Sequence, residues 1–119
     1  SAPFHCALMK PAADAVATAL ESVAVGPLAF PVVANVDALP NRDAARVKEL
    51  LVRQVDGAVR WEESVRAMVD AGVRVALEIG PGKVLAGLAK RIAKDLKVIS
   101  VGDLAAMDEA AKALGLAAR

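Results

Sequence analysis

Three short segments of the chain are almost entirely apolar, and residues with helical periodicity separate each from the next. These segments are residues 31–36, 73–79 and 97–101. Strands that are apolar throughout are buried on both faces, as in parallel sheets covered by helices. Alternation of such strands with helices implies right-handed βαβ units. The pattern therefore predicts an α/β fold of parallel βαβ layers with flanking helices. A sheet of three parallel strands has two open edges, which indicates that part of the sheet is missing.

The intervening segments carry apolar residues at helical spacing and end at residues that start or stop helices. The spacing predicts helices over residues 7–23, 44–55, 61–71, 83–94 and 104–114. Asn41 or Asp43 can cap the second helix and Asp103 the last, while Gly72 and Gly115 follow helix ends. The helix over 83–94 is expected to bury one face, made of Val84, Leu85, Leu88 and Ile92.

Composition limits the chain to a cytosolic type of globular protein. With 119 residues and no linker, repeat or low-complexity tract, we treat it as one unit. The hydrophobic fraction of 56% excludes a disordered chain. Because 27 of the hydrophobic residues are alanine, the helices and strands must pack closely. The single Cys6 excludes an internal disulfide and has no neighbouring cluster for zinc, which favours a reducing compartment.

Charge and hydropathy exclude two classes of partner. The 15 basic and 14 acidic residues are spread without runs, so we predict no nucleic-acid partner. The longest uncharged stretch, residues 22–36, is too short for a bilayer and contains Gly26, Pro27 and Pro31, so we predict no membrane span and a cytoplasmic location. The chain begins at Ser1 without an initiator methionine, which indicates a processed or excised piece.

His5 is the only side chain suited to general acid–base chemistry at neutral pH. A neutral imidazole can accept a proton from a hydroxyl and return it to a leaving thiolate. The alternative is a histidine at a frayed helix start. By its residue type and position alone, the second interpretation would be favoured.

Five motifs occur in an order that resembles one enzyme family. They are PFHCALM (residues 3–9), PVVANV (31–36), LVRQV (51–55), VRW (59–61) and EIGPGKVL (78–85). Together they resemble the carboxyl-terminal part of malonyl-CoA:acyl-carrier-protein transacylases. The discrete bacterial type is the closer match, because the acyltransferase domains of polyketide and fatty-acid synthases commonly carry a different residue pair after the Gly-Pro.

The resemblance implies an activity and assigns two site residues. The family transfers malonyl from coenzyme A to the phosphopantetheine thiol of acyl carrier protein through an acyl-serine, for fatty-acid synthesis, without metal or redox cofactor. It implies that His5 is the general base, oriented by the backbone carbonyl of Gln54 in place of an aspartate. Residues 1–119 would then be the carboxyl-terminal portion of a malonyl/acyl transferase domain, starting just before the catalytic histidine segment, within its α/β-hydrolase-like subdomain.

Other parts of that machinery do not occur in these residues. None of the four serines lies in a G-x-S-x-G elbow. The family's oxyanion-hole glutamine and malonate-binding arginine are also expected on a missing amino-terminal part, so the chain alone is predicted to be inactive. Two alternatives stay open: a non-catalytic α/β interaction module that binds a partner chain, and cleaved halves that remain associated and active.

Three further features have structural interpretations. The Gly80-Pro81-Gly82-Lys83 turn lacks the spacing and the Ser or Thr of a nucleotide loop, so we expect a tight turn between strand and helix. Trp61 is expected to anchor a core or subdomain contact. Arg53 and Arg60 are expected to be surface cations.

Overall fold

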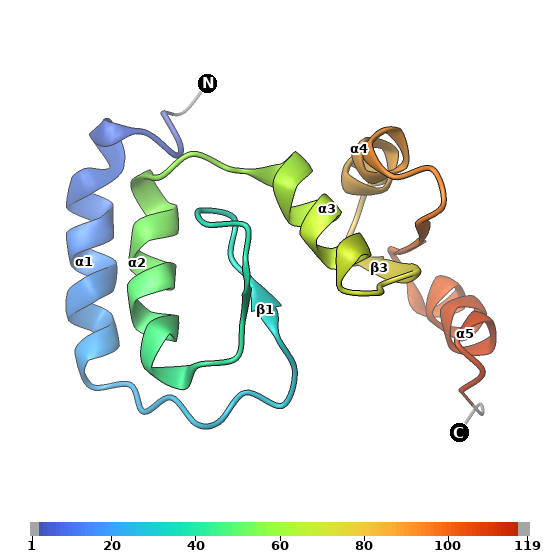
Figure 1. Ribbon diagram of the computed structural model, residues 1–119, viewed down its shortest axis with the longest axis horizontal. Helices are drawn as coiled ribbons and strands as arrows, with labels where there is room; N and C mark the ends of the chain where they lie inside the picture. Colours follow the sequence, from blue (N-terminus) through green and yellow to red (C-terminus); the bar gives the residue numbers. More distant parts are fainter. Residues whose placement is uncertain (1–2, 117–119) are drawn as a thin grey trace. The chain divides into compact units, whose positions relative to one another are not determined.

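The computed structural model describes residues 3–116 of the chain (Figure 1). Contacts divide the chain into two compact units, Ser1–Met68 and Val69–Arg119, and helix α3 (Trp61–Asp70) crosses the boundary. The sequence was treated as one unit because no composition change or linker marks this boundary. The division arises from packing, which composition does not report.

The first unit is built on a pair of adjacent helices. Its helical elements are η1 (Ala7–Met9), α1 (Lys10–Glu21), η2 (Ala44–Arg46) and α2 (Val47–Asp56). Pro11 lies in the first turn of α1, where its missing N–H removes no helical hydrogen bond. Asp43 caps the second segment, since its carboxylate accepts from the amide of Ala45 at 2.8 Å. Figure 1 shows α1 and α2 side by side, in contact along their lengths.

The strand predicted over residues 31–36 is wrong in length and in pairing. Only β1 (Val32–Val33) is extended, and it pairs antiparallel with β2 (Pro40–Asn41). The chain turns immediately afterwards, with the amide of Ala38 donating to the Ala34 carbonyl at 3.0 Å. Ala34 and the following Ala38 are buried in the first unit's core, whereas Val32 is 46% exposed. The predicted sheet of three parallel strands is therefore not formed within residues 3–116.

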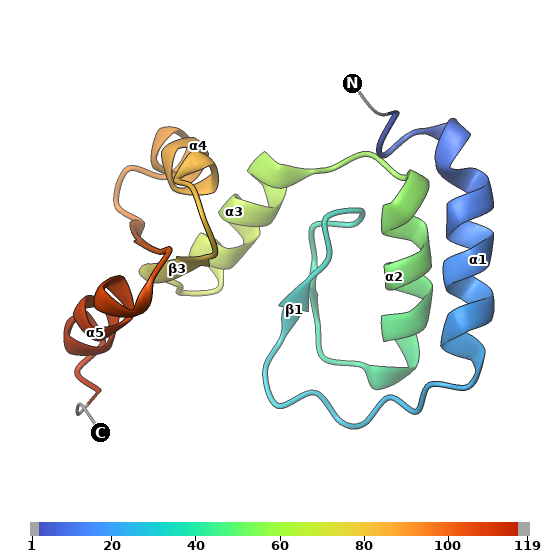
Figure 2. The same ribbon diagram turned by 180° about the vertical axis from the view of Figure 1, so that it is seen from behind.

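The second unit contains a parallel βαβ element, as the α/β prediction requires. Its elements are β3 (Val75–Ile79), α4 (Val84–Ile92), β4 (Lys97–Val101) and α5 (Leu104–Ala113). Strands β3 and β4 are parallel and in register from Val75 opposite Lys97 to Ile79 opposite Val101. Helices α4 and α5 both contact β4, and they can be followed from behind in Figure 2. The fold class of the chain is α/β.

Three of the four residues predicted to form the buried face of α4 are exposed, and the fourth, Ile92, is half-buried. Val84, Leu85 and Leu88 are 71%, 45% and 39% exposed, whereas Ala89 is 4% exposed. Helical periodicity identifies which residues share a face, but burial also requires a second element opposite that face. Within residues 3–116, α4 has β4 as its main neighbour, and Ala89 makes the close approach.

Candidate active site

His5 occupies a strained backbone position two residues before η1 begins. Its φ is +54°, in the left-handed region that costs a residue with a Cβ atom roughly 1–2 kcal/mol. The Nδ1 atom lies 2.9 Å from the carbonyl oxygen of Gln54. A carbonyl oxygen only accepts hydrogen bonds, so Nδ1 must carry the proton in this contact. The structure thus brings together the two residues named from the sequence.

The acceptor for His5 is a carbonyl that the helix itself leaves free. Gln54 lies in the last turn of α2, where backbone carbonyls have no amide partner further along the helix. The preceding carbonyl, of Arg53, accepts from the amide of Gly57 at 3.1 Å. Aligned peptide dipoles also place partial negative charge at this end of a helix. His5 therefore donates to a carbonyl oxygen that no amide of the helix occupies. The partial negative charge at this helix end strengthens that hydrogen bond.

With Nδ1 protonated, the other ring nitrogen of His5 holds a lone pair. The side chain is exposed, so Nε2 is available to a hydroxyl or thiol from outside these residues. Two serine hydroxyls are bound elsewhere: Ser64 donates to the carbonyl of Arg60 at 2.8 Å, and Ser100 donates to Glu78 at 2.9 Å. The arrangement is an oriented base that can receive a proton at Nε2.

Arg53 and Arg60 are both exposed, as predicted for surface cations, but Arg60 also donates to a segment that is distant in the sequence. Arg53 makes an ion pair with Glu49 within its own helix at 2.9 Å, as a surface cation does. Arg60 donates from Nη2 to Glu63 at 3.0 Å and from Nη1 to the carbonyl of Asp37 at 3.0 Å. The hydrogen bond and charge of Glu63 raise the pKa of Arg60, and the hydrogen bond from Arg60 lowers the pKa of Glu63. Arg60 is therefore tied to a distant segment.

A small apolar cavity of about 150 Å³ adjoins Gln54. It lies between the β1–β2 segment and α2, and its walls are Leu28, Val32, Val33, Ala34, Asn41, Val47, Leu50, Leu51 and Gln54. Trp61, which does not line this cavity, is only partly buried, and its indole N–H has no hydrogen-bond partner within residues 3–116. Trp61 is thus less buried than a core anchor.

Glu78 is a site feature of the second unit that sequence reasoning missed. Its carboxylate accepts from the amides of Leu85 and Ala86, at 2.9 and 3.2 Å, and from the hydroxyl of Ser100. Burial alone would raise the pKa of Glu78, but these hydrogen bonds outweigh it and the pKa lies below its usual value. The sequence does contain a signal for this role, because Glu78 is the one acidic residue in an apolar strand.

Backbone conformation explains why glycine occupies both ends of the Gly80-Pro81-Gly82 turn. Gly80 and Gly82 have φ values of +121° and +102°, which residues with a Cβ atom rarely adopt. The first-turn amides of α4, which a phosphate would need, are held by the Glu78 carboxylate. This agrees with the rejection of a nucleotide loop.

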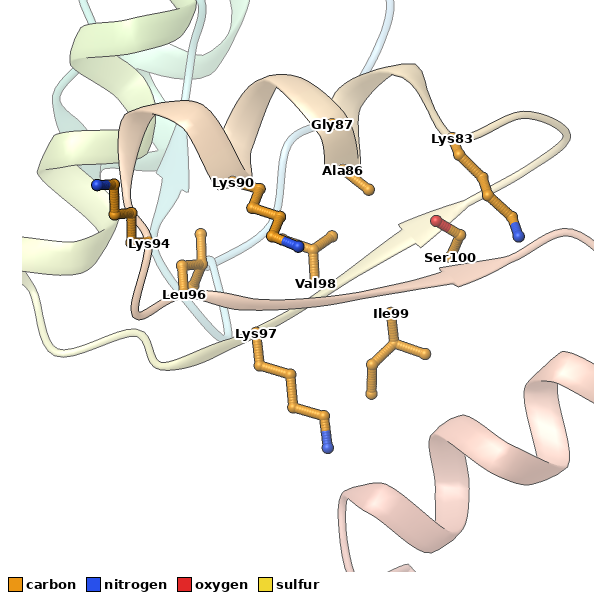
Figure 3. A pocket seen from close by; sticks show the side chains of 10 residues that line it. All are labelled: Lys83, Ala86, Gly87, Lys90, Lys94, Leu96, Lys97, Val98, Ile99 and Ser100. Atoms are coloured by element: carbon orange, nitrogen blue, oxygen red, sulfur yellow. The ribbon is translucent and has the colours of Figure 1, made fainter.

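Lysines surround a cleft along β4 in the second unit. Lys83, Lys90, Lys94 and Lys97 contribute to its walls, and Figure 3 shows Lys90 on the α4 side of β4 and Lys97 on the opposite side. None of the four makes an ion pair with another residue in the range 3–116. Lys97 is the first residue of β4, whereas Lys83, Lys90 and Lys94 lie in α4 or close to its ends.

The described residues contain neither a metal-ligand cluster nor a membrane-spanning helix. No group of three His, Cys, Asp or Glu side chains is placed to hold a metal ion among residues 3–116. In the same range, no helix is long and apolar enough to cross a membrane.

The comparisons with known proteins agree on one kind of enzyme. No family model matches the chain. The malonyl CoA-acyl carrier protein transacylase of Haemophilus influenzae is 46% identical over 108 residues, which make up 91% of this chain and 35% of that protein. The chain therefore spans about one third of the length of the curated relatives it matches.

Solved structures give the same result for the fold. The acyl-carrier-protein-S-malonyltransferase of Bartonella henselae matches 98% of this chain and 37% of its own, with 46% identity and a TM-score of 0.90. A second structure, a malonyl-transacylase in complex with a type II polyketide synthase acyl-carrier protein, has 47% identity and a TM-score of 0.87, over 95% of this chain and 37% of that one. By sequence and by fold, this chain is thus a homologue of malonyl CoA-acyl carrier protein transacylases over a segment of about one third of their length.

Proposed function

We propose that this chain is the carboxyl-terminal portion of a malonyl/acyl transferase domain, and we call the longer protein the parent enzyme. The parent enzyme transfers malonyl from coenzyme A to the phosphopantetheine thiol of acyl carrier protein in the cytoplasm. The observation that carries the proposal is the 2.9 Å contact between His5 Nδ1 and the Gln54 carbonyl oxygen. The names of the relatives, at 43–46% identity, support the substrate class.

In this proposal His5 is the general base of a serine nucleophile on the amino-terminal part. Nε2 takes the hydroxyl proton while the serine oxygen attacks the thioester carbonyl of malonyl-CoA. The acyl-serine forms as the carbon–sulfur bond breaks, and the imidazolium returns the proton to the leaving thiolate. The thiol of acyl carrier protein reverses these steps and regenerates the serine. The Gln54 carbonyl keeps Nδ1 protonated, so Nε2 remains the basic atom.

The proposal is tested by measuring malonyl transfer with three samples: the parent enzyme, its His5→Ala variant and this chain alone. We expect transfer by the parent enzyme, a loss on the order of a thousandfold or more in the variant, and none by the chain alone. Full activity of the variant would refute the role of His5. Activity of the chain alone would refute the role of the missing nucleophile.

A second candidate is a non-catalytic module that binds a partner chain. The observation that favours it is the exposed apolar face of α4, formed by Val84, Leu85 and Leu88. Mixing this chain with the amino-terminal part of the parent enzyme separates the two. Restored transfer and a higher melting temperature support the acyltransferase, including its form as associated halves. Stable binding without transfer supports the module.

A further inference from the structure

Arg60 connects two segments that are far apart in the sequence. Its guanidinium holds Glu63 at the start of α3 and donates to the carbonyl of Asp37, while its backbone amide donates to the carbonyl of Asn35 at 2.8 Å. The turn at residues 35–37 is therefore bound to the chain just beyond α2 through both the main chain and the side chain of one residue.

The same turn reaches the helix end that orients His5. A Cβ atom on Gly57 would come within 2.8 Å of Val36 Cγ2 and 2.6 Å of the Arg53 carbonyl, so the turn, Gly57 and the last turn of α2 are in close contact. The Gly57 amide donates to the Arg53 carbonyl, and the next residue is Gln54. An unbroken series of contacts thus joins Arg60 to the acceptor of His5.

The turn is also fixed to the other end of α2. The Asp37 carboxylate, only 11% exposed, accepts from Arg46 Nη2 at 3.2 Å, and Arg46 directly precedes α2. His5 depends on a different set of contacts, since it leads into η1 and α1, which pack on α2. The separation between His5 Nδ1 and the Gln54 oxygen is therefore set by two independent attachments of α2.

We infer that Arg60 is a positioning residue for the proposed reaction: by fastening the turn at residues 35–37, it aims the Gln54 carbonyl at His5. The inference rests on the proposed function, because it concerns the base of that reaction. Arg53 provides a matched control, since it is also an arginine paired with a glutamate, but its side chain makes no hydrogen bond outside α2 within residues 3–116.

Steady-state malonyl transfer by the parent enzyme tests the inference with the variants Arg60→Ala, Arg60→Lys and Arg53→Ala. We expect Arg60→Ala to lower kcat on the order of ten- to a hundredfold with KM for malonyl-CoA unchanged, because the base is misplaced while substrate contacts remain. Lysine keeps the charge but lacks the planar fork, so Arg60→Lys should recover part of this loss. Arg53→Ala should keep the parent kcat.

Three outcomes would overturn the inference: an unchanged kcat in Arg60→Ala, an equal loss in Arg53→Ala, or a raised KM with kcat intact. If the Arg60→Ala variant does not fold, the Arg60→Lys variant tests the inference. A kcat equal to that of the parent enzyme in Arg60→Lys then refutes the positioning role. The His5→Ala variant separates this result from the proposed function. If the His5→Ala variant is inactive and the Arg60→Ala variant is fully active, only the positioning role is rejected. If the His5→Ala variant is active, the proposed function itself is rejected.

Discussion

Gly57 lies where the chain leaves α2, and the structure leaves no room there for a side chain. A Cβ atom would lie 2.6 Å from the Arg53 carbonyl oxygen and 2.8 Å from Val36 Cγ2, whereas ordinary contact begins near 3.4 Å. The alanine Cβ and the Arg53 carbonyl oxygen must therefore move apart by about 0.8 Å to reach ordinary contact. The φ of Gly57 is −83°, which alanine adopts freely, so the whole penalty comes from these contacts.

We expect Gly57→Ala to destabilise the parent enzyme by about 1–3 kcal/mol, the usual cost of forcing extra volume into a packed site. Urea denaturation measures this as a lower transition midpoint with an unchanged slope. Gln54 follows Arg53 directly, so the displacement also reaches the acceptor of His5, and kcat for malonyl transfer should fall with it.

Gly87→Ala is the matched control for this substitution. Gly87 lies within α4, a Cβ atom there meets nothing within 4 Å, and alanine favours the helix by up to about 1 kcal/mol. The urea midpoint of the Gly87→Ala variant should therefore rise, while its kcat for malonyl transfer is unchanged. Equal midpoints for Gly57→Ala and the parent enzyme would refute the steric argument. A lower midpoint with normal kcat would refute the link from Gly57 to the site.

Three further predictions concern stability. Asp103→Ala removes the carboxylate that accepts from Ala106 at 2.8 Å, so it should cost about 1 kcal/mol in urea denaturation, whereas exposed Asp108→Ala should cost little. Val65→Ala, at a side chain 1% exposed, should cost about 2 kcal/mol in the same assay. Glu78→Gln tests a pH dependence. The pKa of Glu78 is lowered by folding, so its carboxylate stabilises the fold above the ordinary glutamate pKa, and this benefit is lost as pH falls through the lowered value. The stability difference from the parent should be full at neutral pH and vanish in acid, and a difference that is independent of pH would contradict it.

Local signals predicted the elements of the second unit well. The strand over residues 97–101 has the bounds predicted for it, and Asp103 caps α5 as expected. Gly72 and Gly115 have positive φ at helix ends, where that conformation closes the last turn. These features depend on residues close together in sequence, which pattern analysis can detect.

The failures concern contacts between distant residues. Residues 31–36 read as a buried strand because apolar runs look alike whether they cover a helix or join a sheet. The prediction that this face of α4 is buried was wrong for a related reason. Residue spacing cannot show whether another element lies opposite Val84. Neither prediction had information about what surrounds the segment.

The candidate site divides in the same way. Resemblance named His5 and the Gln54 carbonyl, which are 49 residues apart yet in contact. Arg60 is exposed, as predicted for a surface cation, but its hydrogen bond to the Asp37 carbonyl could not be predicted, because that acceptor lies 23 residues away and belongs to the backbone. Glu78 was missed because its acceptor role involves the amides of a turn seven and eight residues later.

The acceptor of His5 is a main-chain atom, and this has a consequence for genetic studies. Every amino acid supplies the same carbonyl at position 54, so no codon change there deletes the acceptor, provided that α2 keeps its course. Under the proposed function, a saturation scan would score position 54 as tolerant although the oxygen there orients the base. Replacing the amide that follows Gln54 with an ester weakens that carbonyl as an acceptor without changing any side chain. Chemical synthesis of the backbone therefore tests the proposed role of this carbonyl, which mutagenesis cannot reach.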